Sequence, residues 1–148
     1  MSRFKLDRSG KTEAFFFQKD DALSNNDINF LKKKSDKKQK NMRICFHKNK
    51  KSILQIMVNL LFKKNAAIIH KHIKKDEFYH LIEGRLKINI FSNNKSLKKV
   101  IILDKKKKFY YLNKKTIHQT IPLTNRSIFL ECRIGPFEKN DTIIYPTK

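Results

Sequence analysis

The sequence is short of several residues on which whole classes of protein depend. Its 148 residues include no tryptophan, three glycines, three prolines and two cysteines. No run of about 18 apolar residues is present, so no membrane-spanning helix is predicted. The first residues, M-S-R-F-K-L-D-R, lack the apolar core of a signal peptide, which predicts a cytoplasmic protein. In such a protein Cys45 and Cys132 are expected to be free thiols packed as small apolar side chains.

Acidic residues are also scarce. Thirteen Asp and Glu stand against 35 Lys and Arg, which gives a formal net charge of +22. A charge of this size ordinarily suggests a nucleic acid or an anionic surface as partner. Here the excess is nearly all lysine, and it accompanies many Asn, Ile and Phe, the mixture that an A+T-rich coding sequence yields. The lysines fall in loops at 32–40, 48–51 and 105–108, and no known nucleic-acid motif is present, so neither a specific nucleic-acid partner nor a membrane partner is predicted.

The length fits a single domain with one core. Residues 1–41 are predicted to form an N-terminal extension with one short helix. Within it, residues 1–14 are polar and expected to be loosely ordered, and a short strand is predicted over 14–18. Ser24 is a candidate N-cap for a helix near 24–34, and a charged connector is predicted over 32–40.

The second segment, residues 42–148, consists of short apolar runs between turn-forming breaks. Nine such runs, with no helical period of useful length between them, indicate an antiparallel sandwich or barrel. Asn93-Asn94 is the strongest hairpin turn. The runs cover residues 42–47, 52–62, 66–72, 78–82, 85–91, 99–103, 109–112, 116–121 and 127–134. The predicted fold class is therefore mainly β with a short N-terminal helix.

The candidate site lies in I-I-H-K-H-I-K-K-D-E-F-Y-H-L-I-E-G, residues 68–84. Its apolar flanks predict two strands joined by a charged turn at 74–76. His70 and His72 stand two residues apart, so both project from the same face of the first strand. If the second strand pairs back antiparallel, the Glu77 carboxylate can approach the two rings. Nitrogen and oxygen donors on adjacent strands suit a divalent transition metal.

The spacing of these residues resembles the first motif of the cupins. His70, His72, Glu77 and Gly84 reproduce the family's His-x-His, four residues, Glu, six residues, Gly. The family has a further histidine on a later hairpin, and His118 in Y-Y-L-N-K-K-T-I-H-Q-T stands there. The resemblance implies a single-domain jelly-roll barrel, or double-stranded β-helix. It also implies one divalent metal ion (Fe, Mn, Ni or Zn) held by the three histidines and Glu77.

Other segments resemble one branch of the cupins, the WbuC-type metalloproteins found with bacterial polysaccharide (O-antigen) biosynthesis genes. They are R-I-C-F-H at 43–47, E-C-R-I-G-P-F at 131–137 and T-I-I-Y-P near the end, within a similarity that covers about 22–148. Asn113 and Lys115 replace the Pro and Gly that the family usually shows before its last histidine. The resemblance implies a small-molecule substrate, a sugar or nucleotide-sugar derivative, with the metal as the Lewis acid of an isomerisation or epimerisation.

Polar residues inside apolar strands are candidates for the surroundings of the metal. Glu131 is the nominated general base, and it shares strand parity with Arg133. Gln55 and Asn59 share parity on another strand. A buried polar group needs a partner, so each of these residues either orients a ligand or faces solvent, and the solvent-facing position is slightly favoured.

The proposed ligands also have simpler readings. His70 and His72 could be solvent-facing histidines at a strand end, and His118 an ordinary barrel residue. Glu77 could be a surface carboxylate paired with Lys74 or Lys75, a kind of pair that contributes little to stability.

Three functional classes therefore stay open at this point. The first is a metal-dependent cupin acting in nucleotide-sugar or polysaccharide metabolism. The second is a non-haem iron cupin dioxygenase, and the third is a non-catalytic module that uses its metal to bind a small ligand. Phe78 and Ile82 are expected on an outer face, which leaves a homodimer open.

Overall fold

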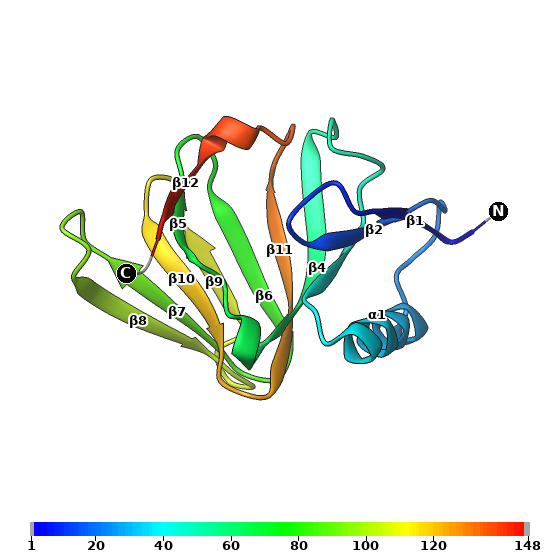
Figure 1. Ribbon diagram of the computed structural model, residues 1–148, viewed down its shortest axis with the longest axis horizontal. Coiled ribbons are helices and arrows are strands. Elements are labelled where there is room, and N and C mark those ends of the chain that lie inside the picture. Colours follow the sequence, from blue (N-terminus) through cyan, green and yellow to red (C-terminus); the bar gives the residue numbers. More distant parts are fainter. Residues whose placement is uncertain (1, 147–148) are drawn as a thin grey trace.

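The computed structural model describes residues 2–146, which form two β-sheets packed face to face and one helix beside the larger sheet (Figure 1). The elements are β1 (Phe4–Asp7), β2 (Glu13–Phe17), α1 (Asn25–Lys38), β3 (Met42–Cys45), β4 (Leu54–Phe62), β5 (Ile69–His72), β6 (Glu77–Glu83), β7 (Leu86–Phe91), β8 (Leu97–Leu103), β9 (Phe109–Leu112), β10 (Ile117–Pro122), β11 (Arg126–Ile134) and β12 (Thr142–Tyr145). Short 3-10 turns occupy Lys63–Asn65 and Lys139–Asp141. The chain is mainly β with one short N-terminal helix, as the sequence predicts.

The two sheets exchange strands in the manner of a jelly roll. The larger sheet has the order β1-β2-β3-β4-β11-β6-β9, and the smaller has the order β12-β5-β10-β7-β8. From β4 onwards the chain passes back and forth between the sheets, so that strands close in sequence face each other across the interior. Figure 1 shows the sheets converging at the lower end of the view and diverging at the upper end. The candidate site lies between them.

All nine apolar runs predicted beyond residue 42 contain a strand. The turn at Asn93-Asn94 joins β7 to β8, and the Asn94 side chain accepts a hydrogen bond from the backbone N–H of Ser96 at 3.1 Å. Two strands escaped prediction, β1 and β12. Each has four residues and an outer position in its sheet, so it presents too few buried side chains to produce a clear pattern.

The N-terminal segment is more ordered than its composition suggests. Residues 1–14 were expected to be loosely ordered, and within the described part of this segment β1 pairs with β2, placing Phe4 opposite Phe17. Residue 1 lies outside the described range. Because β2 pairs in parallel with β3, residues 1–41 contribute two strands to the same sheet that carries β4 and β11.

The helix begins where the sequence places it and ends later. The Asp27 carboxylate accepts hydrogen bonds from the backbone N–H and the hydroxyl of the N-cap Ser24. The predicted end at residue 34 and the connector over 32–40 are wrong, because α1 continues to Lys38. Lysine is a good helix former, and Leu31 and Ser35, four residues apart on one face, are both fully buried.

The interior has an apolar layer on each side of the large sheet. Val58 and Leu60 of β4 pack beneath α1 in one cluster, and alternate residues of the same strand face the sandwich interior. A second cluster between the sheets includes Leu81, Ile88 and Phe129. Because β4 is covered on both faces, it reads in sequence as an almost continuous apolar run.

The strands on either side of the charged turn at 74–76 do not form a hairpin. β5 belongs to the smaller sheet and β6 to the larger, so the conditional antiparallel pairing of these two strands is wrong. The turn instead carries the chain from one sheet to the other. Glu77 consequently reaches the histidines across the interior of the sandwich and not from a neighbouring strand.

Two further findings bear on the sequence predictions. In residues 2–146, no helix has the length and apolar character needed to cross a membrane. Cys45 and Cys132 are both free thiols, as expected.

Gly84 of the cupin-like motif has a conformational reason to be glycine. Its φ of +85° lies in the left-handed region, and an added Cβ would come within 2.5 Å of Thr124 Oγ1 and 2.8 Å of the Arg126 carbonyl oxygen. We expect Gly84→Ala to lower the free energy of unfolding by about 1–3 kcal/mol, measured by urea denaturation. Gly10→Ala is the matched control, since its Cβ would meet no atom closer than 3.7 Å. Equal effects of the two substitutions would contradict this explanation.

Candidate metal centre

The candidate site is a buried polar layer between the two sheets. Ligand atoms of His70 on β5, Glu77 on β6 and His118 on β10 all lie within 4.8 Å of one another. His72 stands beside this group, with its Nε2 atom 3.1 Å from Glu77 Oε1. The smaller sheet thus supplies the imidazoles and the larger sheet supplies the carboxylate.

Two of the histidines are held in the same way. His70 and His118 are direct cross-strand partners, with ring centroids 4.3 Å apart. His70 Nδ1 lies 2.8 Å from the carbonyl oxygen of Ile68, and His118 Nδ1 lies 3.0 Å from that of Thr116. A carbonyl oxygen can only accept, so each Nδ1 carries a proton and donates it. In the neutral ring, the Nε2 lone pair is then free to bind a metal.

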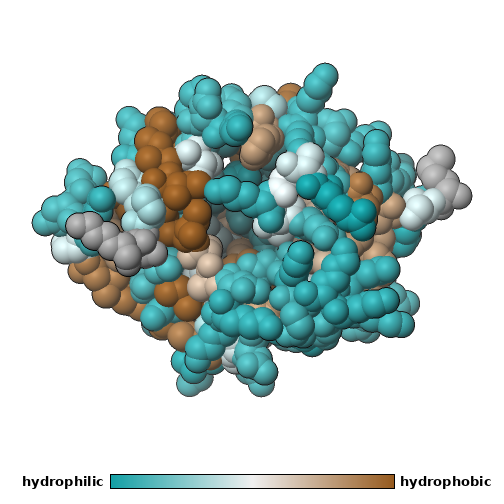
Figure 2. All heavy atoms as spheres, viewed as in Figure 1, coloured by the Kyte–Doolittle hydropathy of each residue, from teal (hydrophilic) through white to brown (hydrophobic). Residues whose placement is uncertain are grey.

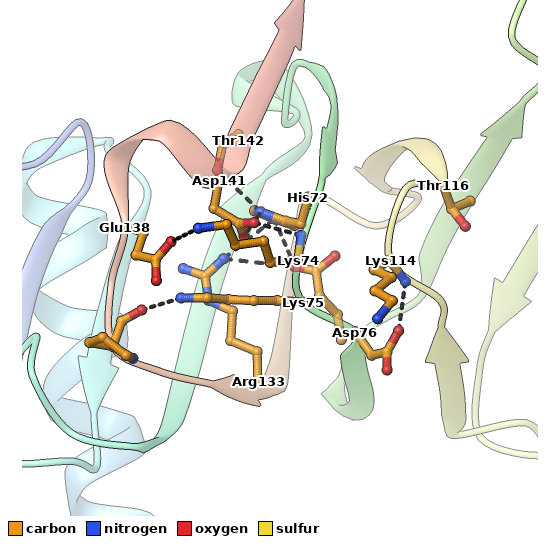
Figure 3. Close-up of polar contacts among 12 residues, drawn as sticks. His72, Lys74, Lys75, Asp76, Lys114, Thr116, Arg133, Glu138, Asp141 and Thr142 are labelled. Carbon is orange, nitrogen blue, oxygen red and sulfur yellow. Dashed lines mark hydrogen bonds and ion pairs between the residues drawn. The ribbon is translucent and has the colours of Figure 1, made fainter.

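His72 is oriented by the C-terminal strand. Its Nδ1 atom lies 3.1 Å from Thr142 Oγ1 and 3.5 Å from Asp141 Oδ2, as Figure 3 shows. The neighbouring carboxylate favours a proton on Nδ1, which again leaves Nε2 as the free nitrogen. Nε2 faces Glu77 and also lies 3.3 Å from Arg133 Nη1. The ring centroid of His72 is 5.2 Å from that of His70 and 6.2 Å from that of His118, so His72 borders the compact group.

Glu77 is the centre of the cluster. Its side chain is 2% exposed, and its Oε2 atom lies 3.2 Å from both His118 Nε2 and the Tyr79 hydroxyl, which donates to it. Burial alone would raise the pKa of this carboxyl, but the hydrogen bond from His118 and the contact with His72 outweigh it and hold the pKa of Glu77 well below its ordinary value. The carboxylate is therefore charged at neutral pH.

The two cross-strand histidines differ in their affinity for protons. Burial, followed by the charge of His118, lowers the pKa of His70 to about 4. Burial also acts against a charge on His118, but its hydrogen bond to Glu77 prevails and raises its pKa above the ordinary 6.5. The contact with Glu77 therefore favours a proton on His118, whereas burial favours a neutral His70.

The larger sheet adds further polar side chains to the interior. Glu131 Oε2 accepts a hydrogen bond from Asn59 Nδ2 at 3.1 Å. Burial, and then the charge of Glu77, raises the pKa of Glu131. The favoured solvent-facing position of Gln55 and Asn59 is wrong, because these side chains are 2% and 5% exposed. Both lie on the interior face of β4, in the strand that α1 covers from the other side.

The turn before His118 holds a lysine in a left-handed conformation, at the position where the cupin resemblance expects glycine. Lys115 adopts a φ of 64°, and its backbone N–H donates to the His72 carbonyl oxygen. A lysine in this left-handed conformation is uncommon and carries some strain. The hydrogen bond ties the β9–β10 turn to β5 and keeps the two histidine-bearing strands in register.

The sequence identified most of the side chains that meet here, and their roles as metal ligands stay a prediction. The structure brings His70, Glu77 and His118 together and places His72 against Glu77. Sequence reasoning missed Asp141, which is 3% exposed and lies behind His72. Asp141 directly precedes the T-I-I-Y-P segment, but the sequence carries no signal that this segment pairs with the strand that bears His72.

The face of the molecule seen in Figure 1 is hollowed. Figure 2 shows a hollow near the centre of the face seen in Figure 1, bordered on one side by apolar side chains over β5 and β12 and on the other by polar ones. Exposed apolar residues of β12 and the residue before β5 are Ile143, Ile144 and Ile68. A small polar molecule could approach the polar layer from this side.

The sequence belongs to a family without an assigned function. The family model described as "Domain of unknown function (DUF6016)" matches residues 23–103, more than half of the chain, and the chain belongs to this family. A search of curated proteins finds no match.

Solved structures identify the fold. A mutant of Bacillus subtilis oxalate decarboxylase is 20% identical with a TM-score of 0.52, covering 63% of this chain and 24% of that one. Another structure of this enzyme, described by its Mn(II) centres, is 12% identical with the same TM-score and coverage. A Shewanella oneidensis protein is 17% identical with a TM-score of 0.53, covering 64% of this chain and 63% of that one. The chain spans about a quarter of the oxalate decarboxylase chains and is a single cupin fold.

Asp141 provides a test of how His72 is held. Replacing it by Asn keeps an acceptor for the Lys74 backbone N–H, which Asp141 Oδ1 binds at 2.7 Å, but removes the negative charge behind the ring. We expect Asp141→Asn to weaken metal binding roughly 10- to 100-fold, measured by isothermal titration calorimetry. Asp104→Asn is the control, since Asp104 also accepts backbone N–H groups in a turn but lies away from the site. An unchanged affinity in Asp141→Asn would show that His72 needs no such support.

The proton on His118 predicts a pH dependence. A metal must displace this proton, whereas His70, with its pKa lowered to about 4, is already neutral at pH 7. Affinity should therefore rise with pH through the neutral range, by roughly tenfold per unit while one proton is displaced, and level off above the raised pKa of His118. Calorimetric titrations with Zn²⁺ between about pH 6 and pH 8 measure this dependence of metal affinity on pH. A flat affinity over that range would contradict histidine ligation.

Proposed function

We propose that the chain is a metal-dependent cupin that acts on a sugar or nucleotide-sugar derivative in the cytoplasm. The ion would be held by His70, His72, Glu77 and His118. The observation that carries the proposal is the direction of the histidines. Their Nδ1 atoms all face oxygen atoms, the Nε2 atoms of His72 and His118 contact the buried Glu77 carboxylate, and a ring nitrogen of His70 lies within 4.8 Å of the ligand atoms of Glu77 and His118.

The donor set fits a divalent ion. Three neutral imidazoles and one carboxylate are ligands that Fe, Mn, Ni and Zn accept, and a five- or six-coordinate ion would keep positions open for water or substrate. A purely structural reading of the cluster is less economical. It leaves three histidines and a carboxylate buried together, where desolvation costs free energy that a bound cation would offset.

Such an ion would supply Lewis-acid chemistry, polarising a carbonyl or hydroxyl oxygen of the substrate. The chain's own residues would orient the ligands and handle protons. The Tyr79 hydroxyl fixes Glu77 Oε2 by donating to it. Glu131 is the proposed acid or base, because its raised pKa favours holding a proton and Asn59 occupies only its Oε2 atom. Glu131 Oε1 is left 3.7 Å from Arg133 Nη1.

The substrate class and the place in bacterial polysaccharide (O-antigen) biosynthesis rest on the WbuC-type resemblance. The segments that carry it surround the site. R-I-C-F-H forms β3 and its end, while E-C-R-I-G-P-F supplies Glu131 and Arg133. The partner proposed is thus a small molecule.

We also propose that two chains associate through Phe78 and Ile82, which face outward and are 37% and 42% exposed.

The ligand set can be tested by metal content. We expect His70→Ala to lose most of the metal found in wild-type protein purified without added ions, because one ligand of a preformed site is missing. Elemental analysis of the purified proteins gives the metal-to-protein ratio. The same samples, incubated with nucleotide-sugar mixtures and followed by nuclear magnetic resonance, report whether any turnover depends on the ion.

His80→Ala is the matched control. His80 lies on the opposite face of β6 from Glu77 and stacks on Phe109 with centroids 4.5 Å apart. This variant should retain the wild-type metal ratio. Loss of metal from both variants, or from neither, would overturn the assignment, and retention of metal without turnover would favour the non-catalytic module.

A further inference from the structure

Two arginines face the polar layer from the larger sheet. Arg43 on β3 is the cross-strand partner of Asn59, and Arg133 on β11 is the partner of Gln55. Asn59 and Gln55 are buried, so both arginines project into the interior next to them. Figure 3 shows Arg133 reaching towards His72 from the strand.

The guanidinium of Arg133 is poorly satisfied where it lies. Its Nη1 atom is 3.3 Å from His72 Nε2, 3.7 Å from Glu131 Oε1 and 4.0 Å from Glu77 Oε1. The two carboxylate distances exceed a hydrogen bond. Its Nε atom is buried and has no hydrogen-bond partner in the described part of the chain. The contact to His72 Nε2 uses the nitrogen that the metal would take, so a bound ion would remove it.

Arg43 is in a similar position. Its Nη1 atom meets only the sulfur of Met57, at 3.4 Å, which is a weak acceptor. Its Nε atom is buried without a hydrogen-bond partner, and over residues 2–146 no carboxylate oxygen comes within 4 Å of its guanidinium. Lys75, the other cation near Arg133, differs because its Nζ donates to the Pro136 carbonyl oxygen.

These observations leave the interior short of negative charge. An arginine side chain stays protonated in proteins, and an incompletely paired guanidinium is costly to bury. A divalent ion would add to the positive side, against the three carboxylates of Glu77, Glu131 and Asp141. A guanidinium presents a rigid fork of N–H donors that matches the oxygens of a carboxylate or a phosphate.

We infer that the site binds an acidic small molecule whose oxyanion, a carboxylate or a phosphate, is held by Arg133 and Arg43 beside the histidine cluster. This inference rests on the proposed function for the ion, and it narrows the substrate to an anionic derivative. The oxyanion replaces the partners that the two guanidinium groups lack. The neutral remainder of the molecule extends towards the hollow at the surface.

The test uses small probes on the full chain loaded with Zn²⁺. Acetate and inorganic phosphate are titrated at constant ionic strength against chloride, and binding is followed by calorimetry and by the rise in melting temperature. We expect at least one of the two anions to bind and to stabilise the protein, and their comparison tells carboxylate from phosphate. Elemental analysis of each sample, before and after titration, establishes that the ion is present.

Arg133→Gln should weaken that binding roughly 10- to 100-fold while the metal ratio stays at the wild-type value. Arg133→Lys keeps the charge without the forked donors, so its anion affinity should lie between those of the wild type and Arg133→Gln. It also replaces Arg133→Gln as the test if that variant does not fold. Arg43→Gln should weaken binding as well. Arg85→Gln is the control for the large positive charge of the chain, since Arg85 is exposed in the loop after β6.

The outcomes separate the two proposals. If no sample retains metal, the proposed function fails before the anion is tested. If metal is retained but neither anion binds more tightly than chloride, or if Arg133→Gln and Arg85→Gln bind it equally, the inference is overturned and the arginines only balance charge within the fold.

Discussion

The structure depends on one arrangement, a buried carboxylate shared by imidazoles that come from the opposite sheet. Glu77 contacts His72 and His118 across the interior, and each histidine is held from behind by an oxygen acceptor. His70 and His118 are each held by the backbone carbonyl two residues earlier, just before the start of their strands, so the same local backbone geometry sets the direction of both rings. The jelly-roll path supplies this condition, since β5 and β6 are consecutive in sequence but lie in facing sheets.

A polar layer of this kind has a cost that the rest of the fold must offset. Burying charged and hydrogen-bonding groups is unfavourable unless they are paired. Apolar packing on both sides of β4 and between the sheets provides the compensating stability. Within the layer, the groups that remain poorly paired are the cationic ones, Arg43 and Arg133. The layer therefore places potential metal ligands close together and leaves two guanidinium groups without full pairing. This combination favours a role in binding.

Local pattern predicted most strands and the shared face of His70 and His72, the family resemblance added His118, and prediction failed where partners are distant in sequence. The period-two placement of His70 and His72, and the short apolar runs, are local properties. The assignment of β5 and β6 to different sheets is a property of the whole topology. Gln55 and Asn59 are buried because the smaller sheet faces their side of β4, while α1 covers the other side. Asp141 reaches His72 from about 70 positions away along the chain, as the β5–β12 pairing requires. The end of α1 was misplaced because a lysine-rich stretch resembles a solvated loop in composition although lysine favours helices.

The most direct test of the account is a crystal structure of metal-soaked protein with anomalous diffraction data collected at the absorption edge of the ion. The account predicts one anomalous peak between the sheets, at about 2.0–2.3 Å from the Nε2 atoms of His70, His72 and His118 and from a carboxylate oxygen of Glu77. Rotation of the His72 ring away from Arg133 would accompany it. A peak elsewhere on the molecule, or histidines that keep their contacts with Glu77 in the presence of excess metal, would contradict the account.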